Sequence, residues 1–221
     1  MMVKLASSKQ WFCDGTFKVS PQGFQQILNI IVYLPGLEIY YPACHLFITH
    51  KTQEVYTMAL SFLKSLGLSQ KNKLNFEPNL ITCDFEPALR NSIKSVFPNV
   101  HISGCYFHFT KCLWEKISKL GLRKQEFKAK SITLISYLQI LVHMPPSRRE
   151  YFFDQIKEIF ANEDSRFGTF FNYFKKNWLK DGFLDELFKA LTGNDDLQFV
   201  RSNNPCEGFH NFLGKFILSS L

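Results

Sequence analysis

Residues 80–114 read LITCDFEPALRNSIKSVFPNVHISGCYFHFTKCLW, and this stretch decides the fold class. Residues 80–82 predict a short strand that stops at Asp84, and Pro87 then lies where the first turn of a helix tolerates proline. In open α/β sheets, ligands are held at the carboxyl ends of strands, which makes Asp84 a candidate site residue. The alternative is that Asp84 or Glu86 caps the helix that follows.

Three predicted strands joined by short turns precede this stretch and favour an antiparallel meander: 10–19, 24–34 and 39–48. The Asp14-Gly15 pair could form a hairpin turn, but the β-formers that follow it at once favour one continuous strand. Pro42 indicates an edge position or a bulge. A helix over 51–66, ended by Gly67, leads towards the next strand.

Downstream of Asp84 the pattern adds a helix and a strand over 101–106, and the strands then cease. Further helices are predicted at 113–122, 127–144, 148–160, 166–178, 183–191 and 203–216. Strand-strand-strand-helix-strand-helix-strand is the order of a mixed sheet with helices on its faces. We therefore expect an α/β protein with a helical block attached to or inserted in its core.

The composition limits the function classes. A chain of 221 residues can bury one good hydrophobic core. Its net charge of +7 and pI near 9.1 indicate either an anionic partner or a basic surface that is merely solvated. Six dispersed cysteines predict a reduced, intracellular protein without a disulfide scaffold. No apolar leader or membrane span is visible, so we expect a soluble, non-secreted protein.

Three acids lie at chemically suggestive places: Asp14 within the first strand, Asp84 after the fourth, and Glu207 early in the last helix. If the first and fourth strands are neighbours, Asp14 and Asp84 share one edge of the sheet. Three carboxylates that meet there would serve as ligands for hard divalent cations and suit two-metal phosphoryl transfer. For Glu207 the alternative is complementing the helix dipole.

The runs that carry these acids resemble, in order, the Mutator-like element (MULE) transposase domain: WFCDGTFKV, ITCDFEPALRNSIKSVFPN, GCYFHF, LWEKI and RSNNPCEGFHNFLGKF. The resemblance extends from about Trp11 to about Phe216. It implies an RNase H-like core with a mixed five-stranded sheet flanked by helices and an all-helical insertion before the last catalytic helix. The corresponding parts are 9–112, 113–200 and 201–221.

The resemblance also implies a reaction and a site. Asp14, Asp84 and Glu207 match the Asp-Asp-Glu (DDE) triad, which binds Mg²⁺ or Mn²⁺ in a two-metal site. The implied activity is DNA transposition and recombination: cleavage of DNA at transposon ends and joining of the released 3′ ends to target DNA. DNA is thus the expected partner, in the nucleus and with no membrane, and a homodimer or larger synaptic assembly is expected.

Further residues belong to the matched motifs. Cys105 and His108 match the family's Cys-x-x-His motif, and Trp114 follows on what we expect to be a buried helix face. Only this pair of zinc-type ligands is regular in spacing, so zinc is not expected. Around the third acid, the supporting residues are Asn203 and Asn204, which would cap the helix of Glu207, and His210.

Two interpretations of the activity stay open. The first is a catalytic transposase domain, expected to be a truncated copy without the family's N-terminal zinc-binding DNA-recognition domain. The second is a domesticated or decayed fragment that holds DNA or protein without cutting; the start of the chain just before the catalytic strand favours this second interpretation.

Overall fold

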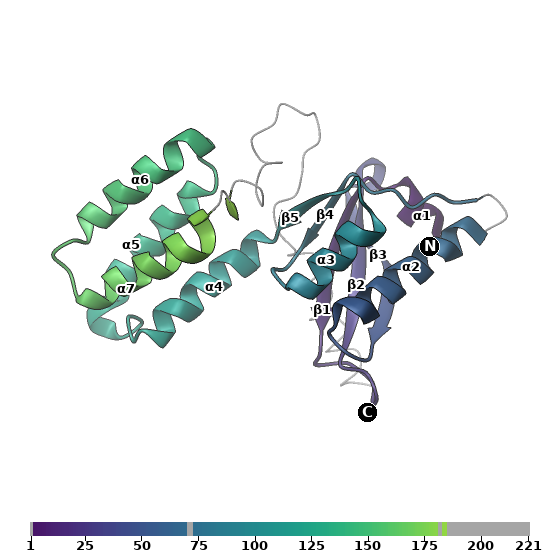
Figure 1. Cartoon of the computed structure of the whole chain (residues 1–221), viewed down its shortest axis with the longest axis horizontal. Helices are drawn as coiled ribbons and strands as arrows, with labels where there is room; N and C mark the ends of the chain where they lie inside the picture. Colours follow the sequence, from purple (N-terminus) through teal and green to yellow (C-terminus); the bar gives the residue numbers. More distant parts are fainter. Residues whose placement is uncertain (1, 70–72, 181–182, 185–221) are drawn as a thin grey trace. The chain divides into compact units, whose positions relative to one another are not determined.

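The computed structural model describes residues 2–69, 73–180 and 183–184, which divide into two compact units after Cys105 (Figure 1). The first unit contains α1 (Met2–Ser7), β1 (Gln10–Thr16), β2 (Gln26–Leu34), the 3-10 turn η1 (Pro35–Leu37), β3 (Ile39–Ile48), α2 (Gln53–Ser69), β4 (Leu80–Cys83), α3 (Pro87–Val96) and β5 (His101–Gly104). The second unit contains α4 (Tyr106–Lys119), α5 (Gln125–Leu141), α6 (Pro146–Ile159), α7 (Ser165–Phe174) and the π-helical turn η2 (Lys175–Leu179).

The five strands form one mixed sheet in the order β3-β2-β1-β4-β5. The first three strands are antiparallel neighbours, as the meander predicted, while β4 pairs in parallel with both β1 and β5. This is the mixed five-stranded sheet of an RNase H-like core, and the predicted fold class is confirmed. The central position of β1 also brings the first and fourth strands together, as the interpretation of the acids required.

Helices α2 and α3 lie on one side of this sheet (Figure 1), and their buried residues form one apolar cluster with Leu5 of α1 and the strands. In α2 the buried residues recur at helical spacing, from Tyr56 through Leu60 and Leu63 to Gly67. They meet alternate residues of the strands, such as Trp11 and Cys13. The opposite side of the sheet has a smaller apolar cluster and also carries the polar residues of β1.

The first strand runs through Asp14-Gly15 without a hairpin, as predicted, although it ends at Thr16 rather than at residue 19. The tight turn comes later, where the Phe24 N–H donates to the Pro21 carbonyl and Gly23 adopts a φ of 91°. A positive φ is accessible to glycine without steric cost. Pro42 lies at a register shift on the edge strand β3, so both predictions for it are confirmed.

Gly67 was predicted to end its helix, and this was wrong. The helix α2 continues to Ser69, and Gly67 is buried inside it. A Cβ atom at Gly67 would lie 2.6 Å from the Leu74 carbonyl oxygen and 2.8 Å from the Phe76 ring. The glycine is therefore required because the following segment packs directly on the helix backbone.

The strand predicted at 101–106 is shorter than expected, because β5 ends at Gly104 and α4 already begins at Tyr106. The helix was predicted only from Leu113. Its buried residues Phe109, Leu113 and Ile117 recur every four positions, which places the aromatic start of the segment on a helix. Helix α1, which buries Leu5, was not predicted.

Aromatic packing dominates the core of the helical unit. Five phenylalanines are fully buried there: Phe109, Phe153, Phe167, Phe170 and Phe174. The rings of Phe153 and Phe174 stack at 5.4 Å, and Trp178 meets Phe109 edge-on at 4.8 Å. Buried Arg149 donates to the Leu141, Val142 and Met144 carbonyls and so satisfies the last turn of α5.

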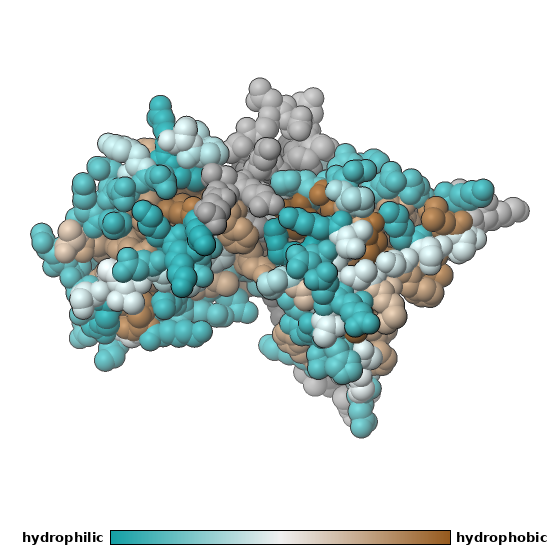
Figure 2. Space-filling model, viewed as in Figure 1, coloured by the Kyte–Doolittle hydropathy of each residue, from teal (hydrophilic) through white to brown (hydrophobic). Residues whose placement is uncertain are grey.

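Hydrophilic side chains cover most of the described surface in the view of Figure 2, with apolar side chains showing between them in both units. Within residues 2–69, 73–180 and 183–184, the helices are too short or too polar to cross a bilayer.

Candidate functional site

Asp14 and Asp84 lie at the same end of two paired strands. The last registered pair of the parallel β1–β4 ladder is Cys13 and Cys83, and each acid directly follows its cysteine. Cys13 and Cys83 belong to the core beneath the helices, so alternation puts Asp14 on the opposite side of the sheet. Asp14 is buried and Asp84 is half-buried. The strand pairing thus brings two acids to one sheet edge across 70 residues of sequence, since 84 − 14 = 70.

Backbone amides orient both carboxylates. The Gly15 N–H donates to Asp14 Oδ1 at 3.0 Å, and the Glu86 N–H donates to Asp84 Oδ1 at 3.0 Å. Helix α3 has Glu86 at its N-cap position, yet the Glu86 side chain makes no capping hydrogen bond. The Asp84 side chain therefore fixes the turn before the helix, and Glu86 serves another purpose.

Glu86 is part of a polar network that ties α2 to the end of β4. Its carboxylate lies 2.9 Å from Lys51 Nζ and accepts a 3.1 Å hydrogen bond from the Tyr56 hydroxyl. The Gln26 amide donates in turn to the Tyr56 oxygen. A Cβ atom on Gly15 would collide with the Gln26 side chain, so the glycine of the Asp-Gly pair makes room for this network. Burial raises the pKa of Tyr56, and the negative charge of Glu86 raises it further, so the hydroxyl stays protonated.

A polar row crosses the sheet beside Asp14. Asn29 is opposite Asp14 in the β1–β2 ladder, and His45 is opposite Asn29 in the β2–β3 ladder. Asn29 is fully buried, and its Oδ1 lies 2.7 Å from His45 Nδ1. Partial burial lowers the pKa of His45, which favours the neutral imidazole. Sequence reasoning missed both residues, although Asn29 interrupts the apolar run ILNIIVYL and so gave a signal.

The cysteines beside the acids are small core residues. Burial raises the pKa of Cys83 to about 12, against an opposing contribution from Arg90. Burial and the neighbouring thiols raise the pKa of Cys13 as well, and burial raises that of Cys44 to about 11. Cys13 and Cys83 belong to the core beneath the helices, on the side of the sheet opposite Asp14. The chemistry available at this edge is therefore carboxylate chemistry.

The Cys-x-x-His motif spans the division between the units. Cys105 is fully buried in the first unit, where its N–H donates to the Cys83 carbonyl at 2.9 Å. His108 and Trp114 lie on α4 in the second unit. Trp114 was expected to be buried, but it is half-buried, with the Arg123 guanidinium 5.9 Å from its ring centre. The backbone of Cys105 thus extends the pairing of β5 with β4 by one hydrogen bond.

The donor chemistry of Asp14 and Asp84 fits a hard divalent cation, because carboxylate oxygens are the ligands that Mg²⁺ prefers and it retains several waters beside them. Across the described part of the chain, no three His, Cys, Asp or Glu side chains are grouped to hold a metal ion. The proposed third ligand, Glu207, lies outside the described residues, as do Asn203, Asn204 and His210. The meeting of the three acids therefore stays a prediction.

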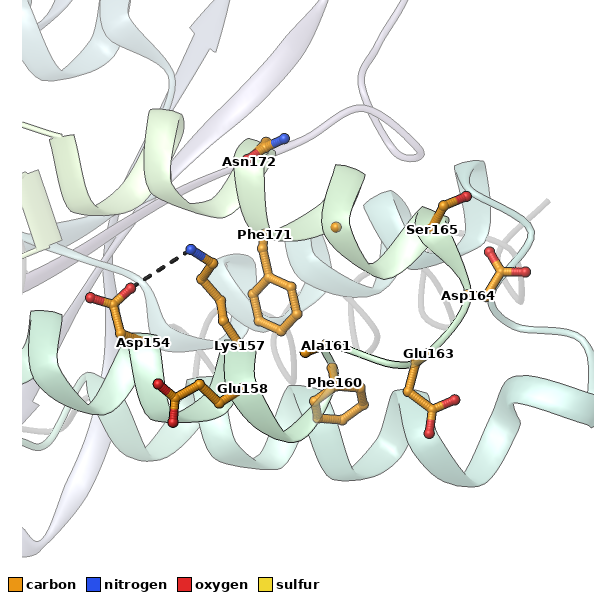
Figure 3. Close-up of a pocket in the computed structure, with 11 residues that line it drawn as sticks. Asp154, Lys157, Glu158, Phe160, Ala161, Glu163, Asp164, Ser165, Phe171 and Asn172 are labelled. Atoms are coloured by element: carbon orange, nitrogen blue, oxygen red, sulfur yellow. Dashed lines mark ion pairs between the residues drawn. The ribbon is translucent and has the colours of Figure 1, made fainter.

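A separate open pocket of about 570 Å³ lies between α6 and α7 in the helical unit (Figure 3). Three of its four acids pair with neighbouring bases: Asp154 with Lys157 (3.8 Å), Glu163 with Lys130, and Asp164 with Arg166 (2.7 Å). The fourth, Glu158, accepts a hydrogen bond from the Gln155 amide. Asp164 also caps α7, and its hydrogen bonds with Arg166 lower its pKa to about 2. Helix capping and surface ion pairs therefore account for the acidic side chains around this pocket.

Residues 10–112 match the family model described as MULE transposase domain. This segment contains the whole sheet, Asp14, Asp84, Cys105 and His108. No curated protein matches the chain.

Proposed function

Because residues 10–112 belong to the MULE transposase domain family, we propose that this chain is a DDE transposase catalytic domain that cuts DNA and joins the released 3′ ends to a target. The family match supports a transposase-related function that involves DNA. The observation that carries the finer proposal is the parallel, in-register pairing of β1 with β4, which leaves Asp14 and Asp84 at one edge of the sheet.

In this proposal, Asp14 and Asp84 supply two carboxylate ligands and Glu207 supplies the third. Bound Mg²⁺ or Mn²⁺ would activate water or a 3′-hydroxyl and stabilise the leaving oxygen. The Gly15 and Glu86 amides hold the two aspartates in fixed orientations, so the carboxylates would need little reorganisation to bind a cation. Glu86 is engaged by Lys51 and Tyr56, which supports a positioning role for it rather than ligation.

The proposed substrate agrees with the charge of the chain. A net charge of +7 favours a polyanion, and phosphate contacts supply most of the non-specific affinity for DNA. We further propose the nucleus as the place of action and a homodimer or larger synaptic complex as the active form, since both follow from the transposition reaction.

The test is nicking of supercoiled plasmid by the 221-residue chain with Mn²⁺. Asp84→Asn keeps an oxygen for the Glu86 amide but loses the negative charge, so nicking should disappear while the fold persists. Asp154→Asn, an acid paired with Lys157 in the helical unit, is the matched control and should nick normally. Nicking that survives Asp84→Asn would overturn the catalytic assignment. DNA binding without any nicking by the unsubstituted chain would favour a binding module instead.

A further inference from the structure

Two aromatic side chains form an exposed pair near the carboxyl ends of β1 and β4, where Asp14 and Asp84 lie. Phe24 precedes β2 and Phe47 lies on the edge strand β3, and their rings are 5.4 Å apart at 55°. Phe24 is 39% exposed and Phe47 is 50% exposed. Two contacting rings left open to solvent present aromatic faces on which a flat ligand can stack.

Strand register places Phe47 on the face of the sheet that carries Asp14, and Phe24 contacts Phe47 there. Asp14, Asn29 and His45 form one cross-strand row, and Thr16, Ile27 and Phe47 form the next. Directly opposite residues share a face, as do residues two apart on a strand. Phe47 is thus two residues along and two strands across from Asp14, roughly 12 Å away on ordinary sheet spacings.

The two chain segments that carry the rings contain basic side chains, of which Lys51 also pairs with Glu86. The segments 17–28 and 45–53, which include both rings, contain Lys18, His45, His50 and Lys51 and no acidic residue. Lys18 is exposed, and the Lys51 ammonium lies 4.9 Å from the centre of the exposed Phe17 ring. A polyanion that carries flat apolar groups matches this combination of charge and aromatic surface.

We propose that Phe24 and Phe47 form a stacking platform for unpaired nucleobases of a DNA strand, with Lys18 contacting its backbone; the inference rests on the proposed DNA-directed function. Bases within a duplex already stack on their neighbours, so a solvent-exposed ring gains a full stacking contact only with an unpaired base. The platform therefore selects single-stranded or frayed DNA beside the carboxylates. It requires no metal, which separates its test from the test of catalysis.

The experiment titrates the full chain, in EDTA, into a single-stranded oligonucleotide that contains 2-aminopurine, and into the matching duplex. Stacking should change the fluorescence of the base analogue. Phe47→Leu keeps apolar bulk but lacks an aromatic face, and it should weaken single-strand binding roughly tenfold with little effect on the duplex. Phe47→Trp should restore both affinity and the fluorescence change. Lys18→Gln should lower the salt slope for single-stranded DNA by about 0.7.

Phe62→Ala removes a ring of α2 that is 60% exposed and outside the platform, and it should bind like the unsubstituted chain. Equal losses for Phe62→Ala and Phe47→Leu would overturn the platform, and so would equal losses on duplex and single strand. Nicking that depends on Asp84 together with unchanged binding by Phe47→Leu would overturn the platform alone. If Phe47→Leu weakens single-strand binding but the unsubstituted chain does not nick DNA, the platform is supported and the proposed catalysis is overturned.

Discussion

Asp14 and Asp84 occupy equivalent positions on two hydrogen-bonded parallel strands, each one residue beyond the registered Cys13–Cys83 pair. Neither acid is distinctive by itself, because Asp84 follows a strand and precedes a helix, as acids commonly do, and Asp14 lies within a strand as part of an Asp-Gly pair. Their equivalence is what matters, since two carboxylates at one edge repel each other unless protons or cations intervene. The predictions below separate this site from the packing that supports it.

Mn²⁺ should raise the melting temperature of the unsubstituted chain, and Asp14→Asn or Asp84→Asn should greatly reduce that rise. A ligand that binds only the folded state stabilises it by about 2.7 kcal/mol at one hundred times its dissociation constant. Without metal, both variants should melt no lower than the parent, because each keeps its amide contact and loses a like charge. Thermal scans with and without Mn²⁺ check this. Identical metal-induced rises in all three proteins would contradict the site.

Tyr56→Phe should destabilise the first unit by about 1–3 kcal/mol, because it leaves the buried Gln26 amide and a Glu86 oxygen without their partner. Lys51→Met should cost less, about 0–1 kcal/mol, since its ion pair with Glu86 is partly exposed. Urea unfolding measures both changes. Neither substitution should alter the Mn²⁺ response of Asp14 and Asp84, and a loss of that response in Tyr56→Phe would make the network part of the metal site.

Gly67→Ala should destabilise the chain by about 1–3 kcal/mol, because the new methyl group would collide with the Leu74 carbonyl and the Phe76 ring. In a helix interior with free space, the same substitution usually stabilises by about 0.5–1 kcal/mol. Gly168 in α7 is the matched control, since its Cβ would meet nothing within 4 Å. Opposite signs for the two variants in urea unfolding are expected. Stabilisation by both would refute the close packing at Gly67.

Stability should fall as pH rises above about 9, with a contribution from Cys83. Burial raises the pKa of this thiol to about 12 from 9.0, so between these values the unfolded chain releases a proton that the folded chain retains. Each such thiol lowers stability by up to about 1.4 kcal/mol per pH unit within that window. Cys83→Ala should therefore flatten the alkaline decline relative to the parent. An unchanged slope in urea titrations from pH 8 to pH 10.5 would show that the thiol ionises as readily in the folded chain.

Much of the sheet could be predicted because its strands carry their own patterns. The continuous strand through Asp14-Gly15, the meander and the edge position of Pro42 all follow from local residue preferences. The pairing of β1 with β4 could only be stated as a condition, since register depends on contacts between distant residues. Once it is formed, the equivalence of Asp14 and Asp84 follows directly.

What escaped prediction depends on tertiary packing. Helix α1 is short and is held by Leu5, whose carbonyl accepts a hydrogen bond from the Trp11 indole at 3.3 Å. Gly67 resembles a helix stop until Phe76 packs against it. The aromatic residues at the start of α4 favour a strand locally, but the burial of Phe109 in the helical unit stabilises the helix instead. The roles of Tyr56 and Asn29 likewise arise from partners on other elements.

The parallel pairing of β1 with β4 also sets an order of events in time. The three-stranded meander joins neighbouring segments, whereas the Cys13–Cys83 pair closes a loop of 70 residues, since 83 − 13 = 70. Closing such a loop costs roughly 4 kcal/mol in chain entropy beyond a length-independent constant. Contacts of this range form late, when earlier structure can offset the cost. Asp14 and Asp84 therefore come together only as the core is completed, so a partly folded chain has no assembled acid pair.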